Sequence, residues 1–496
     1  MALMEYSHER HFSAQPEIPR KFKREMMYTA SRQPEPLLRS HSINVFGEVR
    51  LMAKWTRRGF VGSLSGIAGA TMFGNRASAT AINPPEAAKA SGPIKITDLK
   101  CAIIGRNPTV RIVTDQGISG YGQAESAKPY LKPTVLFYKP YLVGEDPTNV
   151  AALMLKIRRM GATKPWGAAI SAIEIALWDV AGQAAGLPVH KLLGGKIRDR
   201  VRPYGNTENN IGATMTMPRT PQDYAEFATK MREAKEGYTL VKMPIGFHNT
   251  PMMTAIPNTW YGSQWHARAA PYMDRGLMTE RGIDNCIACA EAARKALGED
   301  IGLAFDCGPG WVVKDAIRFA RAVEPLKLAW LEDLITGDYE PYPKPQVFKQ
   351  VTDSTTTPIH TGEELYLREN CMELIETQAI NVIGPDPEDV GGIAELKWIA
   401  EYADLHGILV APHGIFDGLF GVAAQVHMGA AMPQNYIAFE YAKGDPEWWY
   451  DIVDGLPDPV VKNGLIDVWD RPGLGLTFRV QQAKAHLADE DRGFFD

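Results

Sequence analysis

Apolar and polar residues alternate along segments 94–104 and 109–125, and turn-forming residues separate the two. Such alternation predicts β-strands that bury one face. Two later segments, 150–160 and 168–186, repeat their apolar residues every three or four positions instead, which predicts amphipathic helices. Residues 94–201 are therefore expected to form an α+β domain.

From residue 202 the pattern changes to short apolar runs, and most of these are followed by a segment with a helical pattern, such as 315–326 or 393–407. Repeated strand-then-helix order predicts an α/β fold of the (β/α)8 TIM-like barrel type rather than a doubly wound sheet. We expect the barrel to cover 202–470 and a tail to cover 471–496. The apolar runs are 239–245, 301–308, 328–334, 357–364, 380–386, 407–414 and 436–441.

The first part of the chain differs from the rest. Residues 1–51 are polar and show no sustained period, which indicates a disordered leader or a start site placed too early, with Met52 as the true initiator. Residues 80–93 are rich in Ala and Pro and are expected to be a linker.

Residues 52–79 have the layout of an export signal. Arg57 and Arg58 precede a short apolar run, and Ala77 and Ala79 form an A-x-A cleavage site. The run is shorter than the ~20 residues that span a bilayer as a permanent helix. We therefore expect a twin-arginine signal peptide, a periplasmic or secreted mature protein, and no permanent membrane span.

Composition narrows the classes of function. Of the 496 residues 45% are hydrophobic, and 53 Lys and Arg stand against 58 Asp and Glu, a net charge of -5. The chain therefore has no overall basic field, and no nucleic-acid partner is expected. Five scattered cysteines do not suggest a disulfide framework. Cys286 and Cys289 are expected to pack within a helix; a redox or metal pair is the alternative.

Ionisable residues end several of the apolar runs. Active-site chemistry in a (β/α)8 barrel lies at the carboxyl ends of the strands. Asp306, Glu332 and Glu363 end consecutive runs, so we expect them to be neighbours. Three adjacent carboxylates need a cation, and an all-oxygen ligand set favours Mg2+. The other runs place Asp386, His413 and Glu440 at the same end of the barrel.

These motifs resemble the enolase superfamily, of the mandelate racemase and acid-sugar dehydratase type. The resemblance covers about residues 94–480 and implies that 94–201 is a capping domain, with the tail returning to it. The resemblance depends on seven sequence motifs: AISAIEIALWDVAGQAAGLPVHKLLGG (169–195), LAFDCGPGW with Asp306, AWLEDL with Glu332, IHTGEEL with Glu363, GPDPEDVGGI with Asp386, LVAPHG with His413 and IAFEY with Glu440.

The resemblance implies magnesium-assisted removal of a proton α to a carboxylate, on a small-molecule acid. In this scheme His413 is the base and Asp386 holds its other ring nitrogen. Glu440 is expected to be protonated and to hydrogen-bond the substrate carboxylate. The family also implies a homo-oligomer.

Two departures from the family pattern affect the chemistry. Relatives with a lysine base carry two lysines separated by one residue, whereas this chain has Lys242 and then Pro244. Lys242 should point inward and neutralise the metal carboxylates, while Pro244 has no proton to exchange. Where many relatives read Asp-x-Asn or Asp-x-His, this chain reads Asp306-Cys307-Gly308 and lacks the third polar group.

A single base favours β-elimination, in which His413 removes the α proton and then protonates the leaving hydroxide. We therefore expect a sugar-acid dehydratase, a hydro-lyase that gives a 2-keto-3-deoxy acid. A racemase, epimerase or cycloisomerase of the same superfamily is the alternative, and a non-catalytic sugar-acid binding protein is a further one.

The insertion 246–281 is long for a barrel loop and is expected to be a substrate lid. Its Tyr261 and His266 are candidates for substrate contact or for a second base, and an oligomer contact is the alternative for the whole insertion. Arg106 and Lys128 of the first domain are further candidates for substrate contact.

Overall fold

The computed structural model describes residues 92–496, without 125–128, 159–166, 207–216, 262–274, 336–342, 415–417 and 442–446. The expected leader, the signal peptide and nearly all of the expected linker lie outside the described residues. Within the described ranges no helix is long and apolar enough to cross a membrane.

The α+β capping domain is a three-stranded antiparallel sheet, in the order β1-β2-β3, with helices packed on it. Gly117, at a φ of +74°, makes the tight turn that joins β2 to β3. Helix α4 is apolar on almost every side and lies buried in the core of the cap. The elements are β1 (Ile96–Ile104), β2 (Asn107–Thr114), β3 (Ser119–Gln123), α1 (Leu131–Phe137), α2 (Lys139–Leu142), α3 (Val150–Arg158), α4 (Gly167–Ala185) and α5 (Val189–Leu192).

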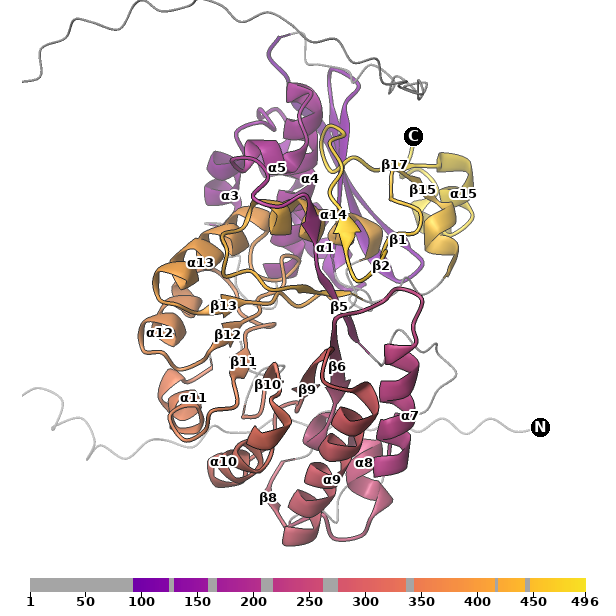
Figure 1. Cartoon of the computed structure of the whole chain (residues 1–496). Coiled ribbons are helices and arrows are strands. Elements are labelled where there is room, and N and C mark those ends of the chain that lie inside the picture. Colours follow the sequence, from indigo (N-terminus) through magenta and orange to yellow (C-terminus); the bar gives the residue numbers. More distant parts are fainter. Residues whose placement is uncertain are drawn as a thin grey trace, which may run out of the picture. The chain divides into compact units, whose positions relative to one another are not determined.

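Eight parallel strands form the second sheet, in the order β13-β12-β11-β10-β9-β6-β5-β14. Backbone hydrogen bonds of 2.9 Å run from Val410 N–H to Asn435 O and from Ile437 N–H to Val410 O. These bonds join β13 to the residues just before β14, so the sheet closes into the predicted (β/α)8 barrel. Figure 1 shows β13, β12, β11, β10, β9, β6 and β5 following one another around it. The strands are β5 (Pro203–Asn206), β6 (Leu240–Pro244), β9 (Gly302–Asp306), β10 (Trp330–Glu332), β11 (Ile359–Thr361), β12 (Val382–Ile383), β13 (Leu409–Val410) and β14 (Phe439–Tyr441).

An apolar layer fills the barrel below its carboxyl end, so that the barrel is a packed core and not a channel. Residues from seven of the eight strands or their flanks form it: Tyr204, Leu240, Ala304, Trp330, Val382, Ala411 and Ala438. The Trp330 ring meets the Tyr204 ring edge-on at 5.3 Å between centroids. Because this layer fills the interior, polar side chains that follow it along the strands lie at the mouth of the barrel.

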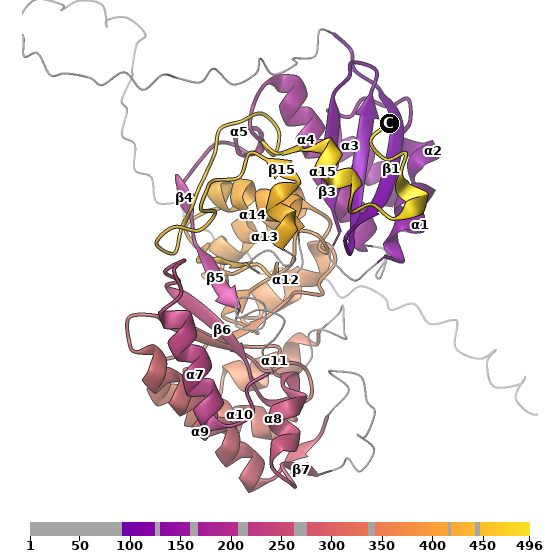
Figure 2. The same cartoon turned by 90° about the vertical axis from the view of Figure 1, so that its right-hand side faces the viewer.

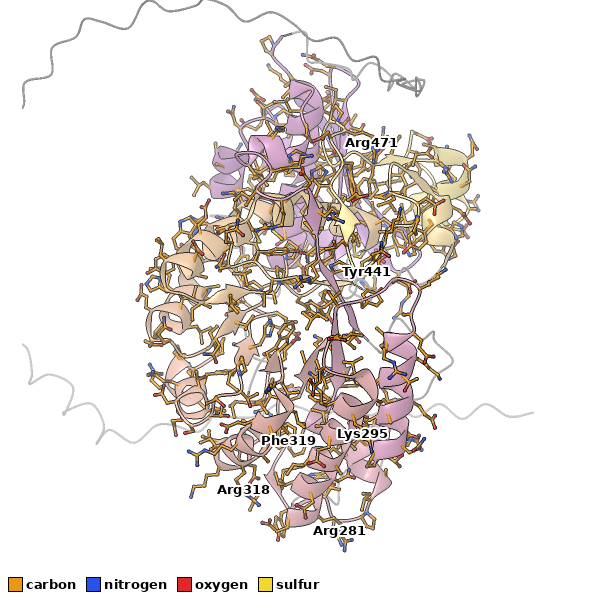
Figure 3. The ribbon with its side chains drawn as sticks, in the orientation of Figure 1. Arg281, Lys295, Arg318, Phe319, Tyr441 and Arg471 are labelled. Atoms are coloured by element: carbon orange, nitrogen blue, oxygen red, sulfur yellow. The ribbon has the colours of Figure 1, made fainter. Side chains whose placement is uncertain are left out.

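Helices follow the strands around the outside of the barrel. On α10 the Phe319 side chain lies on the buried side and Arg318 on the exposed side (Figure 3). Cys286 and Cys289 are buried in α9, where burial raises the pKa of the Cys289 thiol to about 12, as expected for packing residues. The helices are α7 (Pro221–Arg232), α8 (Thr250–Ala255), α9 (Glu280–Leu297), α10 (Val313–Ala322), α11 (Pro345–Thr352), α12 (Glu369–Glu376), α13 (Ile393–Leu405) and α14 (Gly418–Ala431).

The C-terminal tail lies against the first strand of the cap (Figure 2). Leu487 makes an antiparallel bridge with Ile104, and the Asp491 carboxylate accepts a hydrogen bond of 2.8 Å from Ile103 N–H. The tail thereby covers the carboxyl end of the edge of β1 that faces away from β2, at residues 103–105. The remaining elements are β4 (Arg200–Val201), β7 (Trp260–Tyr261), β8 (Leu277–Met278), β15 (Val453–Asp454), β16 (Ile466–Asp467), β17 (Thr477–Phe478), α15 (Val480–Lys484) and the 3-10 turns η2 (Gly246–His248), η4 (Glu324–Leu326), η5 (Glu447–Asp451) and η6 (Asp489–Asp491).

Candidate active site and metal centre

Three carboxylates meet at the carboxyl ends of β9, β10 and β11. Asp306 is the last residue of β9 and pairs in register with Glu332, the last residue of β10. Glu363 follows two residues after the end of β11. Each of the three offers an oxygen, and these oxygens lie within 4.8 Å of one another. The strands are adjacent as predicted, and parallel register aligns their ends.

This cluster has the donor set of a site for a hard divalent cation. Oxygen ligands without nitrogen or sulfur suit such an ion, which keeps its remaining positions for water or substrate oxygens. Asp306 and Glu332 are buried and Glu363 is half-buried, so Glu363 is the member of the cluster that is most accessible to solvent. The three residues therefore could hold one divalent metal ion.

Lys242 lies beside the cluster, on the inner face of β6. Its Nζ is 2.6 Å from Glu332 Oε1, 3.1 Å from Asp306 Oδ2 and 3.1 Å from Glu440 Oε1. The side chain is almost completely buried. One ammonium group thus neutralises part of the charge of three buried carboxylates, two of which belong to the metal cluster.

These contacts set the charge state of the neighbouring acids. Burial alone would raise the pKa of Asp306, but His248 and Lys242 outweigh burial and lower that pKa to about 2. Burial would likewise raise the pKa of Glu440, yet Lys242, His413 and a hydrogen bond lower it. The protonated state expected of Glu440 stays a prediction; in this arrangement Lys242 and the hydrogen bond from Asn206 favour its ionised form.

His413, which follows β13, and Asp386, which follows β12, form a hydrogen-bonded pair beside Glu363 of the metal cluster. His413 Nδ1 lies 2.7 Å from Asp386 Oδ2. The other ring nitrogen, Nε2, is 3.6 Å from Glu363 and 3.7 Å from Glu440. Burial opposes the charged imidazole, but the carboxylates of Glu363, Glu440 and Asp386 raise the pKa of His413 well above its usual range.

His248 is a second imidazole at the mouth, which the sequence pattern did not single out. Its Nδ1 lies 3.2 Å from Asp306 Oδ1. Gly308 has a φ of +54°, and a Cβ there would come within 2.6 Å of the His248 Cβ. The sequence indicated that the polar group at position 308 is missing. His248 lies just after β6, the strand next to β9, and its side chain occupies the space beside Gly308.

Two residues of β5 complete the surroundings of Glu440. Asn206 Nδ2 donates a hydrogen bond of 2.7 Å to Glu440 Oε1, and the Tyr204 hydroxyl donates one of 3.2 Å to Oε2. The strand has only four residues, Pro-Tyr-Gly-Asn, and their sequence does not show the apolar pattern that predicts a strand. Sequence reasoning missed both residues for this reason, although their place beside β14 follows once the barrel is closed.

Of the four predicted substrate residues, two, Tyr261 and Arg106, lie within the described part of the chain. Tyr261 lies in β7 and is 63% exposed, and no contact among the described residues joins it to the carboxylates. Arg106 is exposed in the turn between β1 and β2, beside Gly105, which bonds to His486 of the tail. His266 and Lys128 lie outside the described residues.

A closed (β/α)8 barrel with an α+β cap, three carboxylates on successive strands and a His–Asp pair defines a barrel enzyme with a site for a divalent metal. Residues 223–483 match the family described as Enolase C-terminal domain-like. Residues 85–194 match the mandelate racemase / muconate lactonizing enzyme N-terminal domain. The chain belongs to the enolase superfamily, whose members bind a divalent metal.

Similar proteins cover nearly the same part of the chain. A D-xylonate dehydratase of Haloferax volcanii is 33% identical over 81% of this chain and 90% of its own length. A D-galactonate dehydratase family member of Cellvibrio japonicus is 30% identical over 69% of this chain and 82% of its own length. A mandelate racemase/muconate lactonizing enzyme-like structure from Rubrobacter xylanophilus is 30% identical, with a TM-score of 0.69 over 80% of this chain and 99% of that one.

Proposed function

We propose that this enzyme is a magnesium-dependent hydro-lyase that removes water from a sugar acid and forms a 2-keto-3-deoxy acid. The observation that carries the proposal is the pairing of the Asp306, Glu332 and Glu363 cluster with a hydrogen-bonded His413–Asp386 pair at the same mouth. The names of the xylonate and galactonate dehydratase relatives support the substrate class.

Asp306, Glu332 and Glu363 would hold the cation. A bound Mg2+ would fix the substrate carboxylate and stabilise the negative charge that develops there when the α proton leaves. Because Glu363 would be one of its ligands, this carboxylate would then act less strongly on His413, which favours the neutral imidazole that a base requires. Lys242 keeps Glu332 and Glu440 fixed beside the site.

His413 Nε2 faces the cluster, while Nδ1 is held by Asp386, so Nε2 is the atom that removes the α proton. The Cβ–O bond then breaks, and the imidazolium returns the proton to the departing hydroxide to give water. The enol that remains tautomerises to the 2-keto-3-deoxy acid. Pro244 stands in place of a second lysine and is consistent with this single-base route.

One observation favours the alternative of a racemase or epimerase. His248 supplies a second imidazole at the mouth, beside Asp306 and away from β13. If both imidazoles reach the α carbon, proton transfer between its two faces becomes possible.

An assay in deuterated water separates these reactions. Purified protein with Mg2+ is incubated with a panel of mono- and diacid sugars, and the products are followed by NMR and by a keto-acid assay. A keto-acid product that depends on Mg2+ is the expected result. Deuterium at the α carbon without loss of water would favour racemisation or epimerisation. No product and no exchange with any acid would contradict the proposed function.

We also propose export by the twin-arginine route. Arg57, Arg58 and the Ala77-Ser78-Ala79 site support this location. N-terminal sequencing of protein from the periplasm and from the cytoplasm tests it: a mature chain that starts at Thr80 in the periplasm is expected, and an uncleaved chain confined to the cytoplasm would contradict it.

The expected homo-oligomer stays a prediction. Exposed aromatic side chains of the cap support it, since Tyr130 and Phe137 are each 51% exposed near α1. Analytical ultracentrifugation measures the mass directly, and a monomer at micromolar concentration would contradict the expectation.

A further inference from the structure

Two buried side chains of the cap accept backbone N–H groups at the starts of two barrel helices. The Glu174 carboxylate, on α4, accepts hydrogen bonds of 2.8 Å from Ile393 N–H and 3.0 Å from Ala394 N–H, in the first turn of α13. Gln123 Oε1, at the end of β3, accepts one of 2.8 Å from Phe420 N–H, in the first turn of α14. These helices follow the strands that lead to Asp386 and His413.

A short series of hydrogen bonds connects α4, at its contact with the start of α13, to the backbone of Asp386. Ser171 Oγ, one turn before Glu174 on α4, accepts a hydrogen bond of 2.9 Å from Gly391 N–H. The preceding residue, Val390, donates its N–H to Asp386 O at 2.8 Å. A shift of α4 relative to the 390–394 segment therefore reaches the Asp386 backbone through one peptide unit and one hydrogen bond.

The close approach of α4 depends on glycines. Gly392 has a φ of +106°, and a Cβ there would lie 2.1 Å from Glu174 Oε2. At the start of α4, a Cβ on Gly167 would lie 2.6 Å from the ring of Tyr366, in the segment after Glu363. The Glu174 side chain is 1% exposed. The contact surface between α4 and these loops is thus close-packed, so α4 has little room to adopt another position.

The contact with α14 is linked to His413 in a similar way. Gln425 of α14 donates a hydrogen bond of 2.6 Å from Nε2 to His413 O. Since Gln123 holds the first turn of α14 and Gln425 lies one to two turns later, the cap also fixes the helix that holds the His413 backbone.

We propose that Ser171, Glu174 and Gln123 are positioning residues of the reaction: through α13 and α14, the cap fixes His413 and Asp386 relative to each other and to the metal cluster. None of the three touches the reacting atoms. The reason to expect an effect on rate is geometric, because a misplacement of about 1 Å at the chemistry can cost about 100-fold in rate. The kinetic part of this inference rests on the proposed function.

The kinetic test compares Ser171→Ala, Glu174→Gln and Gln123→Met with the control Gln183→Ala. Gln183 lies on α4 as well, but it bonds Ser119 O within the cap. We expect the three variants to lose at least about 10-fold in kcat with KM changed by less than about threefold, because substrate and metal ligands stay in place while the base is displaced. The control should stay within about twofold of the parent in both constants.

A second measurement needs no substrate. Hydrogen–deuterium exchange of the Mg2+-loaded protein should be faster in peptides that cover 386–394 for Ser171→Ala and Glu174→Gln, and unchanged in Gln183→Ala. For Gln123→Met the increase is expected in the peptide that covers Phe420. Thermal unfolding confirms that each variant is folded, and Ser171→Ala, which removes a single hydroxyl group, serves if Glu174→Gln does not fold.

Two outcomes would overturn the inference: kcat values equal to that of Gln183→Ala, or a loss that appears wholly in KM with unchanged exchange at 386–394. If the parent protein acts on no sugar acid, the proposed function fails instead, and the exchange measurement still decides whether the cap holds this segment.

Discussion

Replacement of Lys242 by Met tests whether one ammonium group stabilises the acidic mouth of the barrel. The Nζ atom contacts Asp306, Glu332 and Glu440 at 2.6–3.1 Å, and all four side chains are largely buried. Met keeps most of the volume and removes the charge. Loss of one partner from a buried ion pair costs about 3–5 kcal/mol, because the remaining charges are left uncompensated.

The expected change in melting temperature follows from the size of the folded unit. An unfolding entropy of about 2.1 cal/mol/K per residue, over roughly 400 residues, gives about 0.8–0.9 kcal/mol/K. The loss of about 3–5 kcal/mol therefore corresponds to a melting temperature that is lower by about 3–6 °C when the protein is measured in EDTA, without bound metal. Saturating Mg2+ should reduce this difference, since a dication held by Asp306 and Glu332 would replace part of the missing charge.

Differential scanning calorimetry at one scan rate measures both values. Lys349→Met is the matched control, because Lys349 pairs with Asp353 at 2.9 Å on the exposed surface. A surface pair of this kind contributes less than about 1 kcal/mol, or about 1 °C here. Equal melting temperatures of Lys242→Met and the parent in EDTA would refute the reasoning, and so would a decrease that Mg2+ leaves unchanged.

Three further predictions concern histidines. His413→Asn should lower kcat by at least about 100-fold, as loss of a general base does, while Mg2+ affinity by calorimetric titration stays the same; weaker metal binding would contradict the assignment of the base. His248→Asn should weaken Mg2+ binding by about 10- to 100-fold, because the imidazole beside Asp306 orients a ligand, and unchanged affinity would exclude that role. Burial and the nearby His190 lower the pKa of His427 to about 3, so only the unfolded chain takes up its proton as the pH falls below about 6.5. The contribution of His427 to the free energy of unfolding should therefore be largest above that pH and fall by about 1.4 kcal/mol per pH unit toward pH 3; in urea titrations the stability of His427→Gln should decrease less steeply over this range than that of the parent, and an equal slope would contradict the assignment.

The apolar pattern predicts the barrel and most of the acidic site because both depend on local order along the chain. Asp306 and Glu332 end continuous buried strands, and the prediction of their strand ends is confirmed. Glu363, Asp386 and His413 lie two or three residues beyond their strands, so the predicted strands were too long. The residues were still found because the first residues after a strand stay at the mouth of the barrel.

The missed residues depend on contacts that the pattern does not contain. His248 reaches Asp306 only because Gly246, at a φ of +63°, turns the chain after β6 and because Gly308 leaves space beside it. Glu174 and Gln123 bond to backbone groups 219 and 297 residues away. A single sequence gives no measure of such separations, although the spacing of Ser171 and Glu174 on one helix face is visible in it.

The pairing of the C-terminal tail with β1 also affects the order in which the chain can fold. Strand β1 is synthesised well before its partners Leu487 and Asp491, since 388 residues separate Ile103 from Asp491. Until then the backbone groups at residues 103–105 on this edge lack their tail partners, and exposed strand edges pair readily with other chains. A chain that stops before residue 486 should therefore aggregate during synthesis even though its barrel and all of its catalytic candidates are present.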